Sequence, residues 1–179
     1  EEFVLPTRTF KRGDAEKSLV SSKKRLEGEQ LVRGQEHFYL EGQVSVASPN
    51  EDGGVHVISS SQHPTEVQKL VASVLGVGIN SVDAEVRRMG GAFGGKESQA
   101  AAIACLASIF AIRNGRPAKY KLARQDDMVQ TGKRHDFWNR YRVGFNDQGL
   151  ISGVEMHLAG MCGCTADLSE GIVDRAMFH

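Results

Sequence analysis

The chain has 179 residues, a length that suits one domain with room for part of a second. Its 22 Lys and Arg residues balance its 22 Asp and Glu residues, so bulk charge argues against a nucleic-acid or membrane partner. Hydrophobic residues make up 40% of the chain, which is enough to fill a core. No apolar run reaches the roughly 18 residues of a membrane span, and no signal peptide is visible.

The cysteines predict neither a disulfide framework nor a zinc site. There are three of them, Cys105, Cys162 and Cys164, and no two have the C-x-x-C spacing. We expect Cys162 and Cys164 to lie on one face of a strand as small buried residues. A reduced protein in the cytoplasm is the corresponding prediction.

The first 33 residues are polar and charged, and the basic run at 23–25 is predicted to be a solvated face. A change of composition near residue 34 indicates a domain boundary. From there the periodicity and the turn residues predict, in order, a strand at 44–47, a strand at 55–58, a helix at 64–75, a strand at 82–86, a helix at 98–113, a strand at 118–122 and a short helix at 124–131.

Two of these helices have distinct patterns. Pro64 suits a first helical position, and Gly76 closes the amphipathic helix that it begins. The helix at 98–113 is alanine-rich and apolar nearly all round, so we expect it to be buried. A hairpin then turns at 146–149, and a last helix, capped by residues 167–169, follows. The fold class is α+β: a βαβαβ unit followed by a β-hairpin and a C-terminal helix.

A loop with four glycines in six residues, Gly90, Gly91, Gly94 and Gly95, separates a predicted strand from a predicted helix. Each glycine costs about 0.5–1 kcal/mol relative to alanine in ordered structure, so four of them indicate positive φ angles or close approach by another group. N–H groups at the start of the following helix can face an anionic ligand. A tight turn without a ligand is the plainer alternative.

The loop departs from both common nucleotide-binding patterns. Gly90-x-x-x-x-Gly95-Lys96 matches most of a P-loop, but Glu97 stands where Ser or Thr would hold magnesium, which argues against nucleotide hydrolysis. Ala92 replaces the second glycine of a dinucleotide fingerprint. A stand-alone nucleotide- or anion-binding module that uses the Gly90–Gly95 loop and a structural interaction domain both stay open as alternatives.

The segment 90–97 resembles the cofactor loop of the molybdenum hydroxylases, the xanthine dehydrogenase and aldehyde oxidase family. Four more stretches resemble this family in the same order: 35–41, 61–62, 131–135 and 174–179. The motifs are most similar to those of the xanthine dehydrogenases and imply the molybdopterin-binding subunit of a bacterial enzyme. On this resemblance, residues 1–33 are the tail of a preceding hammerhead domain, and residues 34–179 are the first molybdopterin-binding domain, truncated at its C-terminus.

The resemblance also implies roles for single residues. Gln62 corresponds to the glutamine that hydrogen-bonds an oxygen on molybdenum, and Phe93 and Gly94 correspond to the backbone beside the metal and its pterin. Glu97 and Arg175 correspond to the pair that orients a purine. No side chain of the family's xanthine dehydrogenases binds the metal directly, so a His or Cys cluster is not expected.

For the whole protein, the resemblance implies hydroxylation of hypoxanthine or xanthine at a molybdenum–molybdopterin centre. The family's catalytic glutamate lies far towards the C-terminus and is not in this chain, so we expect no catalytic residue here and no activity of the chain alone. A 2Fe–2S cluster and FAD elsewhere, with NAD as electron acceptor, are the other cofactors implied. The implied partners are the rest of the molybdopterin-binding subunit and an iron–sulfur/FAD subunit.

Overall fold

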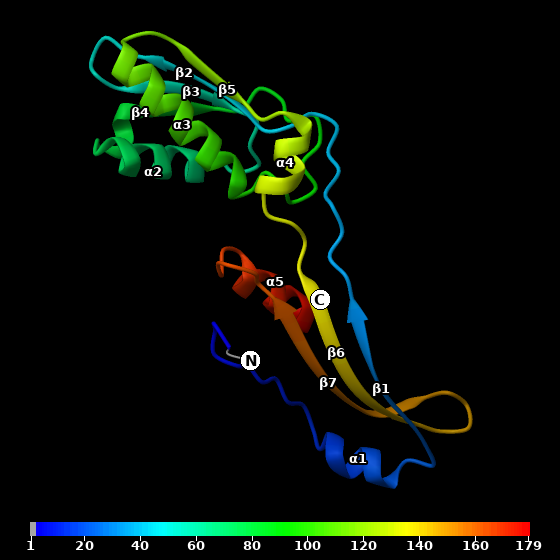
Figure 1. Ribbon diagram of the computed structural model, residues 1–179. Coiled ribbons are helices and arrows are strands. Elements are labelled where there is room, and N and C mark those ends of the chain that lie inside the picture. Colours follow the sequence, from blue (N-terminus) through cyan, green and yellow to red (C-terminus); the bar gives the residue numbers. More distant parts are fainter. Residues whose placement is uncertain (1–2) are drawn as a thin grey trace. The chain divides into compact units, whose positions relative to one another are not determined.

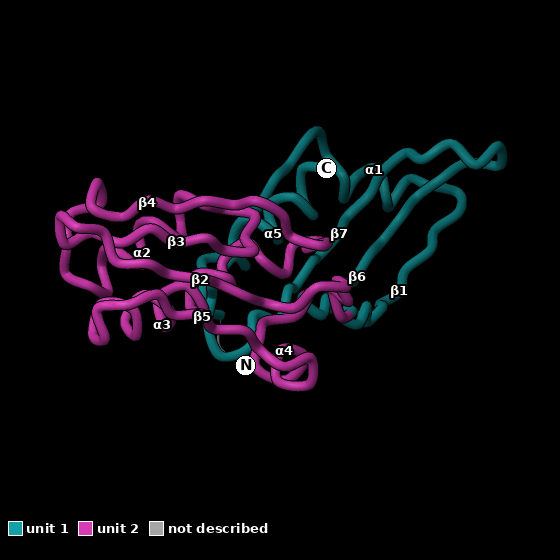
Figure 2. The backbone as a smooth tube through the Cα atoms, turned by 90° about the horizontal axis from the view of Figure 1, so that it is seen from above, with its two compact units in different colours: residues 1–35, 135–179 teal, residues 36–134 magenta. Residues whose placement is uncertain are grey.

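A computed structural model describes residues 3–179, which form two compact units. Unit 2 is one continuous stretch, Glu36–Arg134, and unit 1 combines the residues up to Gln35 with His135–His179. Figure 2 shows the two units in different colours. The change from one unit to the other after Gln35 lies next to the boundary predicted near residue 34, whereas the assignment of residues 1–33 to a preceding hammerhead domain stays a prediction.

Unit 2 is built on a four-stranded sheet. Its strands are β2 (Val44–Pro49), β3 (Val55–Ser59), β4 (Val82–Glu85) and β5 (Ala118–Lys121), in the order β4-β3-β2-β5. β3 and β4 are parallel, while β2 is antiparallel to both β3 and β5. The predicted order β-α-β-α-β is confirmed, since β3 and β4 are joined by a helical crossover, as parallel neighbours require.

Helices α2 (Pro64–Leu75) and α3 (Gln99–Asn114) pack on the sheet of unit 2 (Figure 1). As predicted, Gly76 ends α2, with a left-handed φ of 69°. A 3-10 turn, η1 (Ile79–Ser81), precedes β4, and the short helix α4 (Arg124–Gln130) follows β5. The core between sheet and helices consists of small and branched side chains: Ala47, Val55, Val57, Val67, Val71, Ala72, Val82, Ala101, Ala104, Ala107 and Ala111.

The prediction that the alanine-rich helix is buried holds for only one of its faces. Ala104 and Ala107 of α3 are fully buried, but Leu106 is 41% exposed and Phe110 is 56% exposed. The sheet and α2 cover a single face of this helix, so the apolar residues on its other side lie at the surface of the described chain. Apolar composition all round did not distinguish these two faces.

Unit 1 is a three-stranded antiparallel sheet with two helices. The strands β1 (Lys24–Val32), β6 (Asp136–Phe145) and β7 (Ile151–Met161) lie in the order β1-β6-β7. Helix α1 (Ala15–Ser21) and the C-terminal helix α5 (Ser169–Phe178) both pack against β7. The predicted hairpin and last helix are confirmed, whereas α1 and β1 were not predicted.

Two details of unit 1 correct the sequence-based predictions. Strand β7 ends before Cys162, so this residue and Cys164 lie in the following turn, where Cys164 is exposed; they are not a buried pair on a strand. The N-cap of α5 is Leu168, without a side-chain capping bond. Ser169 is buried, and its hydroxyl oxygen lies 2.7 Å from Nε2 of His135.

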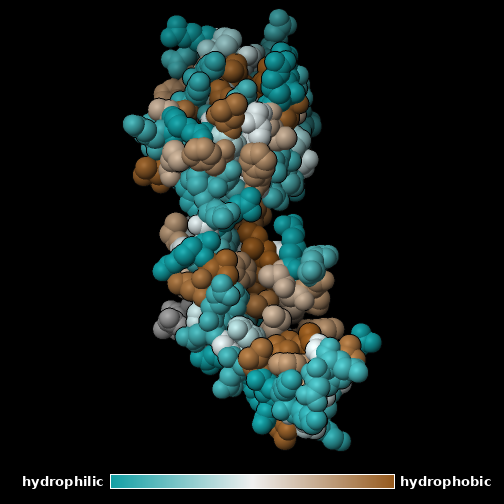
Figure 3. Space-filling model, turned by 90° about the vertical axis from the view of Figure 1, so that its right-hand side faces the viewer, coloured by the Kyte–Doolittle hydropathy of each residue, from teal (hydrophilic) through white to brown (hydrophobic). Residues whose placement is uncertain are grey.

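Hydrophobic side chains are also present at the surface (Figure 3). Among the large hydrophobic residues in the strands and helices of unit 1, the most exposed are Val20, Leu26, Ile151 and Met156. Between residues 3 and 179, no helix has both the length and the hydropathy needed to cross a membrane.

Candidate functional site

The glycine loop, residues 90–95, connects β4 to α3 in unit 2. Gly90, Gly91 and Gly94 have φ angles of 63°, 89° and 96°, and Phe93 also has a positive φ of 54°. A residue other than glycine in this region is uncommon and stores backbone strain of about 1–3 kcal/mol when it is held there. The loop therefore has a specified, partly strained conformation, as its glycine content predicted.

Gly95 is required for a different reason, which is close packing. A Cβ atom at this position would lie 2.7 Å from Cε1 of Tyr39 and 2.8 Å from Cγ of His37. The two rings are stacked, with centroids 6.4 Å apart. The motif at 35–41 thus supplies the aromatic surface against which the glycine loop packs, and both reasons expected for the glycines are present.

Gln62 binds the backbone of the glycine loop through one end of its side chain. Its Oε1 atom accepts from the N–H of Gly94 at 3.1 Å and from the N–H of Lys96 at 3.3 Å. Two backbone donors identify this atom as the oxygen of the amide. The Nε2 group has no hydrogen-bond partner within residues 3–179, so the exposed NH₂ is available to donate to a ligand.

Phe93 is held at its backbone and open at its side chain. Its carbonyl oxygen accepts a hydrogen bond from the guanidinium of Arg134 at 3.0 Å, while its ring is 62% exposed. In the same motif, Gly132 N–H donates to Oε1 of Gln99 at the start of α3. The 131–135 motif therefore fixes the loop and the helix that follows it.

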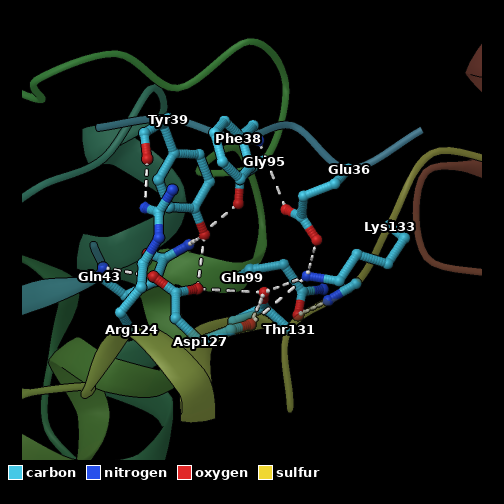
Figure 4. Close-up of polar contacts among 11 residues, drawn as sticks. Glu36, Phe38, Tyr39, Gln43, Gly95, Gln99, Arg124, Asp127, Thr131 and Lys133 are labelled. Carbon is cyan, nitrogen blue, oxygen red and sulfur yellow. Dashed lines mark hydrogen bonds and ion pairs between the residues drawn. The ribbon is translucent and has the colours of Figure 1, made fainter. Parts of the chain in front are cut away.

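A polar cluster lies next to the glycine loop and contacts it through Gln43. It consists of Tyr39, Gln43, Asp127 and Thr131, and we call it the Asp127 network (Figure 4). Asp127 accepts from the Tyr39 hydroxyl at 2.6 Å, from the Gln43 N–H at 2.9 Å and from the Thr131 hydroxyl at 3.1 Å. Burial, followed by the bond to Asp127, raises the pKa of Tyr39 to about 12. Because Asp127 lies in a short polar helix, its pattern gave no signal that this carboxylate is buried.

Charged groups near the aromatic motif shift two further pKa values. Burial, the cation of Arg134 and that of Lys133 lower the pKa of His37, although Glu36 opposes them. For Glu36, burial raises the pKa, but the hydrogen bond from Lys133 and that from the N–H of Phe38 outweigh it and lower the pKa overall. Figure 4 shows the Lys133–Glu36 pair, whose closest atoms are 2.7 Å apart. The lowered pKa favours the neutral form of His37 beside the two cations.

Lys96 does not occupy the place of a P-loop lysine. Its side chain is fully buried, and Nζ donates to the carbonyl oxygen of Glu41 at 2.7 Å, to the hydroxyl of Ser60 at 2.8 Å and to the carbonyl oxygen of Met89. Its three N–H groups are thereby used inside the protein. The Lys96 ammonium is therefore not available to bind a phosphate, which argues against the alternative of an anion-binding module.

The predicted substrate residues lie in different units. Glu97, half-buried, comes directly before α3 in unit 2, and Arg175, exposed, lies in the last turn of α5 in unit 1. In the part of the chain that the structure describes, neither side chain forms a hydrogen bond or an ion pair. Within residues 3–179, no group of three or more His, Cys, Asp or Glu side chains is placed to hold a metal ion.

Comparison with known proteins shows the family to which the chain belongs. Residues 2–179 match the molybdopterin cofactor-binding domain family. The chain belongs to this family. It is 44% identical over 179 residues to a xanthine dehydrogenase of Dictyostelium discoideum and 41% identical over 180 residues to a xanthine dehydrogenase/oxidase of Gallus gallus, with all of the chain covered in both cases. Aldehyde oxidase 3 of Mus musculus is 39% identical over 99% of the chain.

Solved structures show the same fold at lower sequence identity. The structure of the aldehyde oxidoreductase of Desulfovibrio gigas matches with a TM-score of 0.73 and 23% sequence identity. The alignment covers 83% of the chain described here and 16% of the oxidoreductase chain. The structure of quinoline 2-oxidoreductase of Pseudomonas putida 86 matches with a TM-score of 0.71 and 18% sequence identity. This alignment covers 82% of the chain described here and 19% of the quinoline 2-oxidoreductase chain. The chain spans only 13% of the length of each of the three relatives above.

Proposed function

We propose that this chain supplies one wall of a molybdenum–molybdopterin site in an enzyme that hydroxylates hypoxanthine or xanthine. Gln62, Phe93 and Gly94 are the residues that we assign to the cofactor, and Glu97 and Arg175 those that we assign to the purine. The observation that carries the proposal is the orientation of Gln62, whose oxygen is bound by the loop and whose NH₂ group points away without a partner.

The chemistry of the chain's own residues suits this cofactor. The NH₂ group of Gln62 can donate to an oxygen atom of the cofactor but cannot bind a cation. The Phe93 carbonyl accepts a hydrogen bond from Arg134, which fixes the loop backbone, and the exposed ring of Phe93 offers the cofactor apolar surface. When bound, the molybdenum centre supplies the oxidising capacity for hydroxylation. The role of these residues is to hold and orient it.

The substrate assignment rests on two unpaired charged groups. A purine has polar atoms at both ends, which a carboxylate and a guanidinium can bind together, whereas an aldehyde has a single carbonyl group. Placing both charges at a site for an aldehyde alone would leave at least one of them without a partner. A guanidinium can also stabilise negative charge that develops on the substrate. Because an aldehyde oxidase is among the relatives, aldehyde is the second candidate substrate class.

The remaining features of the enzyme are part of the same proposal. They are a 2Fe–2S cluster and FAD that carry electrons onward, NAD as acceptor, the remainder of the molybdopterin-binding subunit and an iron–sulfur/FAD subunit as partners, and a cytoplasmic location. The general base belongs to another part of the protein in this proposal. The cytoplasmic location rests on the cysteine content of the sequence, since three cysteines are too few for a disulfide framework.

The test compares two substrates in the protein expressed from its complete gene. Glu97→Ala is expected to reduce turnover of hypoxanthine by about 100-fold, the effect of a charged hydrogen bond worth about 3 kcal/mol in the transition state. Turnover of a small aromatic aldehyde should hold or rise. Glu51→Ala, at an exposed turn position, is the control and should change neither rate. Equal losses on both substrates would mean that Glu97 only supports the loop.

A further inference from the structure

Lys96 is fully buried, yet it carries an ammonium group and has no carboxylate at ion-pair distance in the described residues. Its Nζ atom donates to three acceptors on three separate segments, which are the carbonyl oxygen of Glu41, the hydroxyl of Ser60 and the carbonyl oxygen of Met89. It also lies 4.6 Å from the centroid of the Tyr39 ring, within the range of a cation–π contact. One ammonium group therefore joins the start of the glycine loop to two other stretches of unit 2.

The backbone of the same residue contacts Gln62. The Lys96 N–H donates to Oε1 of Gln62 at 3.3 Å, and the Lys96 carbonyl oxygen accepts from the Gln62 N–H at 2.9 Å. The hydroxyl of Ser61 also donates to this carbonyl at 3.4 Å. Because anchor and contact belong to one residue, a displacement of the Lys96 side chain displaces the amide that orients Gln62.

We propose that Lys96 is a positioning residue of this site: its buried ammonium fixes the glycine loop so that the N–H groups of Gly94 and Lys96 point at Gln62. This inference rests on the proposed role of Gln62 and the loop in holding the cofactor. Lys96 itself touches neither cofactor nor substrate in this proposal, since its three N–H groups are occupied inside the protein.

Energetic reasoning separates this role from a purely stabilising one. Burial of an ammonium is costly, and an apolar side chain of similar size often serves the stability of a core as well or better. A buried charge does penalise alternative loop conformations, because each one would remove hydrogen-bond acceptors from a group that water cannot reach. Burial lowers the pKa of Lys96, while the charges of Asp127 and Glu41 oppose this shift.

A second anchor lies beside the first and acts in the same direction. The side-chain NH₂ of Gln43 donates to the carbonyl oxygen of Gly95 at 3.0 Å and to the hydroxyl of Tyr39 at 3.1 Å. Figure 4 shows Gln43 and Gly95 together with Asp127, which holds the Tyr39 hydroxyl. The ring of Tyr39 is consequently fixed beneath the Lys96 ammonium, and the loop is held at both of its ends.

The test uses backbone hydrogen exchange of Lys96→Met, with Lys69→Met, an exposed lysine of α2, as the matched control. We expect exchange at the amides of Gln62, Gly94 and residue 96 to become about tenfold faster or more, the effect of losing roughly one hydrogen bond. The core amides of Val57 and Ala104 should be unchanged. Unchanged loop exchange, or an equal increase in loop and core, would overturn the proposal, because the second result is that of a residue needed only for stability.

Ser60→Ala is the milder variant if Lys96→Met does not fold, since it keeps the ammonium and removes one acceptor. It should accelerate exchange at the same amides by a smaller factor, and the proposal fails if it does not. Molybdenum content of the protein expressed from its complete gene is the second readout: Lys96→Met should retain less metal than Lys69→Met. If Lys96→Met loosens the loop but Gln62→Ala retains all its molybdenum, the positioning role stands and the proposed cofactor role of Gln62 falls.

Discussion

The side-chain oxygen of Gln62 lies 3.1 Å from the backbone nitrogen of Gly94 and accepts its hydrogen bond. Since a backbone N–H can only donate, this contact determines which end of the Gln62 amide faces the loop. The opposite end is therefore a donor whose direction is set by the fold before any ligand binds. Preorganised donors of this kind lose little freedom on binding.

The orientation of the Gln62 amide can be tested by replacing the amide with a carboxylate. In Gln62→Glu, one oxygen still accepts from Gly94 and Lys96, but the donating NH₂ is absent. We expect loop hydrogen exchange close to that of the unmodified protein, together with a fall in turnover of about tenfold or more, the effect of losing one hydrogen bond in the transition state. Gln62→Ala, which removes both ends, should accelerate loop exchange and reduce turnover. Full activity in Gln62→Glu would refute the assigned direction.

Gly95→Ala should destabilise unit 2 by about 1–3 kcal/mol, the usual cost of overpacking. The added Cβ would meet Tyr39 and His37 at less than 3.0 Å, and the Asp127 network holds Tyr39 in place. Urea dependence of amide exchange in α3 gives the free energy. Gly171→Ala is the control, because a Cβ there meets nothing within 4 Å; it should be neutral or stabilising. A destabilisation no larger than that of Gly171→Ala would contradict the close packing.

The stability of unit 2 should depend on Tyr39 at alkaline pH. Its pKa is raised to about 12 in the folded state, whereas a free tyrosine loses its proton near pH 10. The folded state therefore keeps the proton that the unfolded chain releases. The stabilisation is fully present below pH 10 and is lost as pH rises to 12, with a limiting slope of about 1.4 kcal/mol per pH unit.

Tyr39→Phe isolates this effect, because it removes the titrating group and keeps the ring. The difference in unfolding free energy between the two proteins, measured by urea unfolding at a series of pH values, should change between pH 10 and 12 in the direction of lower stability for the unmodified protein. A difference that stays constant over this interval would show that Tyr39 does not keep its proton in the fold.

Periodicity predicted β3 and α2 of unit 2 because each of them buries one face. Val55 and Val57 of β3 alternate with half-buried residues, and α2 repeats its apolar residues at helical spacing. β1 offered no such signal, because eight of its nine residues are exposed and Gly28 is half-buried. Its pairing with β6, from Lys24 opposite Phe145 to Val32 opposite Phe137, depends on a strand far along the chain. The local sequence of β1 therefore does not indicate its pairing with β6.

The site was predictable to a different extent. The glycines indicated a constrained loop, and the family motifs brought Gln62 and Gly94 into consideration together. The direction of the Lys96 side chain was not predictable, since a spacing that matches a P-loop is equally compatible with a lysine that points into the protein. Asp127 was missed because a carboxylate in a seven-residue polar helix usually faces water; here it is 1% exposed.

The interrupted sequence of unit 1 has a consequence for synthesis on the ribosome. Unit 2 is continuous in sequence, so its internal contacts can form as the nascent chain emerges, whereas β1 pairs with β6, which is synthesised later. During this interval β1 is an unpaired strand edge, the kind of surface that drives aggregation. Lys24, Arg25, Glu27 and Glu29 are charged and exposed, and charges on a waiting strand oppose its association with other nascent chains. We therefore expect the same charged residues that gave no periodic signal in β1 to oppose its aggregation until β6 has been made.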